Sequence, residues 1–144
     1  MTDEERRRIA GHPVLLYDSV CALCNGVVRW VLRHDREGVF LFAPLESAIA
    51  AEMLGTGVST NDGVAVVTGA FVPAQRVLRR SDAVAEALRL LGWRRRARML
   101  ELTPKPLREF GYGIVARLRY RLFGRYAACP LPPVEERRRF LGQG

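Results

Sequence analysis

The sequence predicts an α/β fold with a basic, mainly helical C-terminal extension, and three observations lead to this prediction. Short apolar runs typical of buried strands alternate with stretches of helical periodicity over the first two thirds of the 144 residues. Gly69 and Ala70 separate two neighbouring strand-like runs, as in a hairpin. Residues 73–144 carry seventeen basic and six acidic side chains, whereas residues 1–72 carry six and nine. The basic charge therefore belongs to the second half of the chain.

The predicted elements follow in a regular order after a polar start that we expect to be frayed. Strands are expected at 14–17, at 39–42 before Pro44, at 63–68 and within 71–78. Helices are expected from Cys21 to the residue before Gly38, at 47–54, and from Ser81 to Leu91. Asp18 or Ser19 is expected to cap the first helix, and Ser81 and Asp82 the last. The order is βαβαββα, a thioredoxin-like arrangement with parallel strand pairs and one antiparallel hairpin strand.

The remaining residues are expected to extend this core rather than form a second domain. Residues 93–102 and 107–124 have helical patterns, the second with Ile114, Val115, Leu118 and Leu122 at helical spacing. Prolines make the segment after Cys129 extended or turn-like, and 134–141 is predicted as a last short helix. About fifty residues cannot readily build their own core. We therefore predict a single domain over 1–144, with a thioredoxin-like core at 13–92 and a helical extension at 93–144 packed on it.

Composition and the chain start exclude several classes of protein. Three cysteines are too few for a small secreted disulfide scaffold. The longest stretch without charge, 63–75, is shorter than the roughly 18 to 20 apolar residues of a membrane span. The start has acidic residues at 3–5 and only a short apolar run at 14–17, unlike a secretory signal. We expect a soluble, cytoplasmic protein in a reducing compartment.

Cys21 and Cys24 lie where the first predicted strand passes into the first predicted helix. The N-terminus of a helix carries unpaired N–H groups and partial positive charge, which favour a thiolate at the first sulfur. The spacing places Cys24 about one helical turn further on, where it can attack a mixed disulfide formed at Cys21. We therefore predict a redox-active centre in which Cys21 attacks, Cys24 resolves and the pair cycles through a disulfide bond. No cofactor or metal is predicted.

Two other interpretations of the pair stay open. A structural zinc site uses the same spacing but needs four ligands, and only Cys129, His12 and His34 remain to complete one. The two cysteines can also be small buried apolar residues without chemistry. The position between strand and helix favours redox chemistry over both.

Asp18 precedes Cys21 by three residues and is the third candidate site residue. Its carboxylate could accept or relay a proton during exchange if it lies near Cys24. It could equally be a helix cap or turn former. The sequence leaves both roles open.

Several blocks of the sequence resemble the DCC family of thiol-disulfide oxidoreductases. The first is the run at 14–24, which carries Asp18, Cys21 and Cys24 in the pattern from which the family takes its name. The others are the segments at 42–47, 80–83, 116–124 and 129–132, so the resemblance covers nearly the whole chain. It implies a thioredoxin-like fold, protein-disulfide reductase activity, a redox pair at Cys21 and Cys24, and the family's acidic position at Asp18.

The chain departs from the wider thioredoxin pattern just before the third predicted strand. Thioredoxins have a cis-proline just before the third strand, whereas this chain has Asn61, Asp62, Gly63 and Val64 there. Either Gly63 or Val64 then faces the cysteines, or the substrate is held differently. The third thiol, Cys129, is interpreted as a structural cysteine, with a second resolving role as the alternative.

The basic half has its own alternative function. One group of arginines lies at 94–98, and another, Arg117, Arg119, Arg121 and Arg125, alternates with aromatic residues. Such runs are most often the solvated face of an amphipathic helix, but they can bind an acidic protein, nucleic acid or a membrane surface. No known nucleic-acid motif supports a nucleic-acid partner. The leading prediction is an enzyme that exchanges disulfides with a protein or a small thiol, with an unidentified electron donor. The alternative is a non-catalytic thioredoxin-like binding module.

Overall fold

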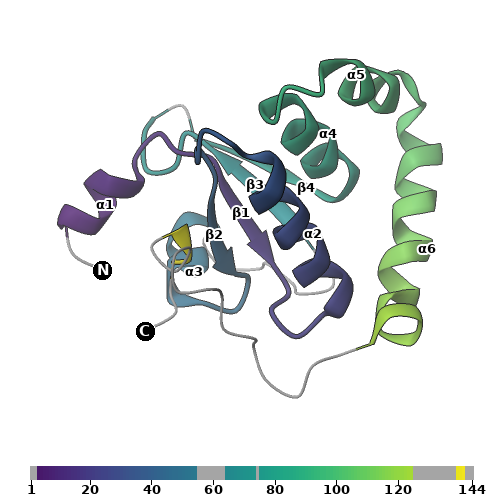
Figure 1. Ribbon diagram of the computed structural model, residues 1–144, viewed down its shortest axis with the longest axis horizontal. Helices are drawn as coiled ribbons and strands as arrows, with labels where there is room; N and C mark the ends of the chain where they lie inside the picture. The colour runs from purple at the N-terminus through teal and green to yellow at the C-terminus, as the bar shows by residue number, and fades with distance from the viewer. Residues whose placement is uncertain (1–2, 55–63, 74, 125–138, 142–144) are drawn as a thin grey trace.

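The computed structural model describes residues 3–54, 64–73, 75–124 and 139–141 (Figure 1). This part of the chain forms helices and strands in an alternating order that ends in consecutive helices. In chain order they are α1 (Asp3–Ile9), β1 (Val14–Tyr17), α2 (Ala22–His34), β2 (Leu41–Pro44), α3 (Ala48–Leu54), β3 (Val64–Thr68), β4 (Arg76–Arg79), α4 (Arg80–Leu90), α5 (Arg94–Leu102) and α6 (Lys105–Phe123).

The four strands form one mixed sheet in the order β2-β1-β3-β4. β1 runs parallel to β2, and Val14 lies opposite Leu41. β3 runs antiparallel to β1, and β4 runs antiparallel to β3. The predicted α/β fold, consistent with a thioredoxin-like fold, is confirmed. The expectation of several parallel pairs is wrong for the described strands, because the chain enters β3 from the opposite end of the sheet.

Helices cover both faces of the sheet. In β1, Leu15 and Tyr17 pack into the cluster that includes α2 and α4, whereas Val14 and Leu16 pack into the cluster of α1 and α3. Alternate strand residues point to opposite faces, so burial of all four residues requires both faces to be covered. This burial explains why β1 is continuously apolar.

The C-terminal region is helical, and it lies beside α2 and α4 (Figure 1). α4 contacts α5, and α6 contacts both α2 and α4. The Arg80 Nε donates to Glu109 Oε2 at 2.7 Å, which joins the start of α4 to α6. Helix α6 thus runs past the N-terminal end of α2, where the cysteine pair lies.

The orientation of α6 differs from the sequence pattern. Ile114, Val115 and Leu122 are exposed, although their helical spacing is typical of a buried face. Tyr112 and Tyr120 instead pack against the core cluster. Arg119 and Tyr120 donate hydrogen bonds to buried Asp18, so their side of α6 faces the core. The apolar spacing favours a different side of the helix.

Several predicted boundaries need correction. The start of the chain contains the helix α1, and β2 spans Leu41–Pro44, so Pro44 is the last residue of the strand rather than the break after a strand at 39–42. The N-cap of α2 is Cys21, not Asp18 or Ser19. The N-cap of α4 is Arg79, whose side chain makes no capping hydrogen bond. Ser81 does not cap α4, because its hydroxyl donates to Glu109 on α6.

A short C-terminal segment returns to the sheet. Of the predicted helix at 134–141, residues 139–141 are described: Arg139 is in a 3₁₀ turn, and the helix does not include Phe140 and Leu141. Phe140 forms a parallel bridge with Phe42, and Leu141 N–H donates to the Phe42 carbonyl. The Phe140 ring also stacks on Phe42 with a centroid distance of 5.1 Å. This segment therefore extends the sheet beyond β2.

Candidate active site

The cysteine pair lies at the predicted junction between strand and helix. Cys21 occupies the N-cap of α2 in an extended conformation, and Cys24 lies in the first turn. The backbone N–H of Cys24 donates to the Cys21 Sγ at 3.3 Å. Both cysteines are free thiols, with 0% and 4% of their surface exposed. The structure thus brings the two predicted redox residues together. Cys129 lies outside the described residues.

Polar contacts hold the loop before α2. The side-chain amide of Asn25 donates to the Ser19 carbonyl at 2.8 Å and to the Cys21 carbonyl at 2.9 Å. Ser19 donates its hydroxyl to Glu46. Asn25 is buried, so these bonds replace those it would make to water. Sequence analysis missed Asn25, the fourth residue of α2, and the available signal was a side-chain amide directly after Cys24 in the first turns of the predicted helix.

Asp18 is buried and makes contacts in two directions. Its Oδ1 accepts the Val20 N–H at 3.2 Å, so Asp18 forms the turn before Cys21. Its Oδ2 accepts from Arg119 Nη2 at 3.2 Å and from the Tyr120 hydroxyl. The side chains of Asp18 and Arg119 are 3% and 5% exposed. Asp18 therefore joins the cysteine loop to α6 through a buried ion pair.

Arg119 is the functional residue that sequence analysis placed wrongly. The sequence pattern groups it with Arg117, Arg121 and Arg125 in a run typical of a solvated helix face, but Arg119 is buried and points into the protein. A buried aspartate next to the cysteine pair needs a cation as a partner, and that requirement was the available signal. Gly124 adds a second contact from α6, because its carbonyl accepts the Ala22 N–H at 3.2 Å. The end of α6 thus satisfies one free donor at the start of α2.

The residues around Cys24 shift the pKa of its thiol. Burial, together with the hydrogen bond and the charge of Cys21, raises the pKa of the Cys24 thiol. The positive charge of Arg119 and a backbone hydrogen bond from Asp18 act in the opposite direction and lower this pKa in part. Burial also raises the pKa of Tyr112 to about 12. At neutral pH, Cys24 and Tyr112 therefore both keep their protons.

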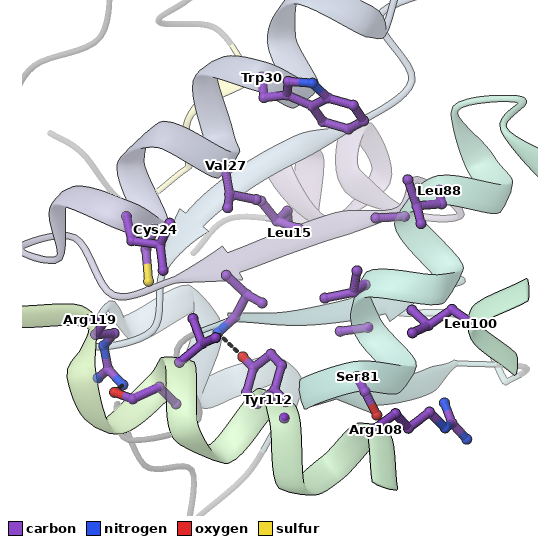
Figure 2. A pocket seen from close by; sticks show the side chains of 18 of the residues that line it. Leu15, Cys24, Val27, Trp30, Ser81, Leu88, Leu100, Arg108, Tyr112 and Arg119 are labelled. Carbon is purple, nitrogen blue, oxygen red and sulfur yellow. Dashed lines mark hydrogen bonds between the residues drawn. The ribbon is translucent and has the colours of Figure 1, made fainter. Parts of the chain in front are cut away.

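A cavity of about 610 Å³ lies between α2, α4 and α6 and reaches the sheet (Figure 2). Cys24 and Val64 are among its lining residues, and Cys21 is not. Figure 2 shows the Cys24 sulfur pointing from α2 towards α6 and Arg119. Of the two residues expected to replace the cis-proline, Val64 therefore shares this cavity with Cys24, and Gly63 lies outside the described residues.

The predicted basic surface is present in part. Arg94, Arg95, Arg96 and Arg98 are exposed on α5, and the Arg96 guanidinium lies 4.4 Å from the Trp93 ring centre. No described helix is long and apolar enough to cross a membrane. In the same part of the chain, no three His, Cys, Asp or Glu side chains are grouped so that they could hold a metal ion.

A thioredoxin-like sheet with two thiols at the N-terminus of its first core helix defines a protein of the thiol–disulfide oxidoreductase class. Sequence comparison agrees, because the profile of the DCC1-like thiol-disulfide oxidoreductases matches residues 15–125. The chain belongs to this family.

Two curated relatives support the assignment. The chain is 34% identical over 130 residues to the uncharacterized protein YuxK of Bacillus subtilis (strain 168), covering 89% of this chain and 93% of the relative. It is 34% identical over 121 residues to a DCC family protein, described as chloroplastic, of Arabidopsis thaliana, covering 83% of this chain and 69% of the relative. No solved structure matches the chain significantly.

Proposed function

We propose that the protein is an enzyme of the protein-disulfide reductase type, working by dithiol–disulfide exchange at Cys21 and Cys24. One observation carries the proposal: Cys21 is the N-cap of α2, and the Cys24 N–H points at its sulfur from 3.3 Å. A backbone donor and a helix N-terminus support negative charge on a sulfur that attacks a disulfide or leaves one.

The cycle begins with the reduced pair. The Cys21 thiolate attacks one sulfur of a substrate disulfide, forms a mixed disulfide and releases the other substrate sulfur as a thiolate. Cys24 then loses its proton and attacks the Cys21 sulfur. The second substrate thiolate leaves, and a Cys21–Cys24 disulfide remains. Two electrons pass from the protein to the substrate. Because both thiols are buried, the first step requires local opening around Cys21.

Arg119 and Asp18 have positioning roles in this proposal. The charge of Arg119 favours the thiolate of Cys24, which is needed for the resolving step. Asp18 holds Arg119 in place through its Oδ2. Since this carboxylate already accepts from Arg119 and Tyr120, we assign it positioning of α6 rather than transfer of the Cys24 proton.

Trapping of the mixed disulfide tests the order of attack. Cys24→Ser should accumulate a mixed disulfide on Cys21 when mixed with a disulfide-containing protein, and Cys21→Ser should not accumulate one on Cys24. Cys129→Ser serves as the matched control and should turn over like the parent. Trapping on Cys24 alone would reverse the assigned roles, and trapping on neither would contradict the enzyme proposal.

A second candidate function is a binding module that uses the basic helical surface. It is favoured by the exposed arginines of α5 together with large exposed apolar residues on α6, such as Leu107, Phe110 and Leu122. Arginine next to apolar surface suits an acidic protein or an anionic membrane. Salt-dependent binding to anionic vesicles that persists in the Cys21→Ser, Cys24→Ser double variant would support this function. Equal binding to neutral vesicles, or no binding, would argue against it.

A further inference from the structure

The proposed cycle leaves a disulfide between Cys21 and Cys24 that must be reduced by two electrons before the next turnover. The Cys24 sulfur borders the cavity between α2, α4 and α6 (Figure 2). Cys24 is among the residues that line the 610 Å³ space between α2, α4 and α6. Cys21 is 0% exposed and is not among them. A reductant that enters this cavity therefore meets the Cys24 sulfur.

The cavity suits an apolar molecule. Its volume lies within the roughly 300 to 1,000 Å³ of typical small-molecule sites. Side chains such as Leu15, Val27 and Leu88 form most of its wall (Figure 2). The polar side chains in the wall already have partners in the protein, for example Tyr112 with the Val64 N–H at 3.3 Å. A polypeptide backbone in this space would lose its hydrogen bonds to water without replacement.

The buried Nε of Arg108 is a donor in the wall that a ligand can use. Arg108 Nη1 donates to Asp82 Oδ1 at 2.7 Å, but the buried Arg108 Nε has no hydrogen-bond partner among the described residues. Arg108 and Cys24 lie at opposite sides of the cavity in Figure 2. An oxygen at the far end of an apolar chain could accept from this N–H while the other end of the ligand reaches Cys24.

We propose that this cavity binds a small apolar dithiol that reduces the Cys21–Cys24 disulfide. One thiolate of the reductant attacks the Cys24 sulfur, and Cys21 leaves as a thiolate and takes up a proton. The second thiol of the reductant then attacks the reductant's other sulfur, which is bonded to Cys24 in the mixed disulfide. The reductant leaves as a cyclic disulfide, and Cys24 leaves as a thiolate that is then protonated. Two electrons pass from the reductant to the protein.

Burial favours a dithiol over two single thiols. Cys24 is 4% exposed, so a mixed disulfide on its sulfur is shielded from a second molecule. A dithiol resolves the mixed disulfide intramolecularly, without that second encounter. The inference rests on the proposed function, because it requires the Cys21–Cys24 disulfide to form.

Dihydrolipoamide, a dithiol on an alkyl chain that ends in an amide, is a suitable probe, with dithiothreitol as the polar comparison. Reduction of the oxidised protein is followed by quenching with an alkylating reagent and mass spectrometry. Each rate is divided by that of the same reductant with hydroxyethyl disulfide. We expect the normalised rate with dihydrolipoamide to exceed that with dithiothreitol by about tenfold, from the apolar surface buried in the cavity.

Two glycines provide a matched pair of variants. Gly111 lines the cavity and Gly26 does not, and a Cβ at either position meets nothing within 4 Å. Gly111→Trp should remove the preference for dihydrolipoamide by filling the cavity, and Gly26→Trp should keep it. Octanamide, which has the chain and the amide but no thiol, should compete with dihydrolipoamide for the cavity and slow its reduction of the protein. This competition uses the parent protein, so it tests whether dihydrolipoamide binds in the cavity even if Gly111→Trp does not fold.

The outcomes separate the two proposals. If the Cys21–Cys24 disulfide forms but both reductants have equal normalised rates, the cavity proposal is overturned and the proposed function stands. A preference that survives in Gly111→Trp, or no competition by octanamide, also overturns the cavity proposal. If no Cys21–Cys24 disulfide forms on oxidation, both proposals fail.

Discussion

Replacing Arg119 by methionine tests the buried ion pair that joins α6 to the cysteine loop. The charges of Asp18 and Arg119 lie 3.2 Å apart with side chains that are 3% and 5% exposed. At an effective dielectric constant of about 20, the attraction over this distance is about 5 kcal/mol before desolvation is subtracted. Removing one partner of a buried pair typically costs about 3 to 5 kcal/mol, because the other charge is left uncompensated.

We expect Arg119→Met to lie at the lower end of that range, because Tyr120 and the Val20 N–H still donate to Asp18. A loss of about 3 kcal/mol lowers the urea midpoint by about 1.5 M if the slope is about 2 kcal/mol per molar urea. The measurement is equilibrium urea unfolding followed by circular dichroism. Arg121→Met is the matched control, since Arg121 is on the same helix and exposed.

A double variant separates the effect of the lost charge on stability from the effect of changed packing. Asp18→Asn together with Arg119→Met removes both charges, so the double variant should be more stable than Arg119→Met alone. Equal midpoints for Arg119→Met and Arg121→Met would refute the reasoning. So would a double variant whose loss is simply the sum of the two single losses.

Three further predictions concern pH and packing. Because the folded protein keeps the Cys24 proton above the ordinary thiol pKa of 9.0 while the unfolded chain releases it, stability should fall as pH rises above 9. The slope should approach about 1.4 kcal/mol per pH unit and should be smaller in Cys24→Ser, as measured by urea unfolding between pH 8 and 10. Phe140→Ala should cost about 2 kcal/mol, because the ring stacks on Phe42, whereas Phe110→Ala, at a ring that is 68% exposed, should change the urea midpoint little. Ultraviolet titration of the parent should show a tyrosine step near pH 12 that Tyr112→Phe removes.

The sheet and the cysteine pair could be predicted because local signals determine them. β1 is buried on both faces, and such a strand is recognisable as a continuous apolar run. Two cysteines directly after it, at the spacing of one helical turn, follow from the sequence alone. Here the predicted residues, Cys21 and Cys24, lie together as expected.

The contacts that α6 makes with the cysteine loop could not be predicted, because they depend on which side of α6 faces a loop that is distant in the sequence. Apolar spacing assigns Ile114 and Leu122 to the core, yet both are exposed. Arg119 faces the core because buried Asp18, 101 residues earlier in the chain, requires its charge. A hydrophobic pattern measures the preference of a helix for apolar surroundings, but it carries no information about a single buried charge elsewhere.

The most direct test of the central claim is whether Cys21 and Cys24 form a reversible disulfide. Trypsin cleaves after Arg8 and Arg29, so both cysteines lie in the peptide 9–29, and Cys129 lies in another peptide. After mild oxidation of the native protein, alkylation and digestion, we predict that peptide 9–29 is two hydrogens lighter and carries no alkyl group. After reduction it should carry two. Peptide 9–29 with both thiols alkylated after every oxidative treatment would contradict the account.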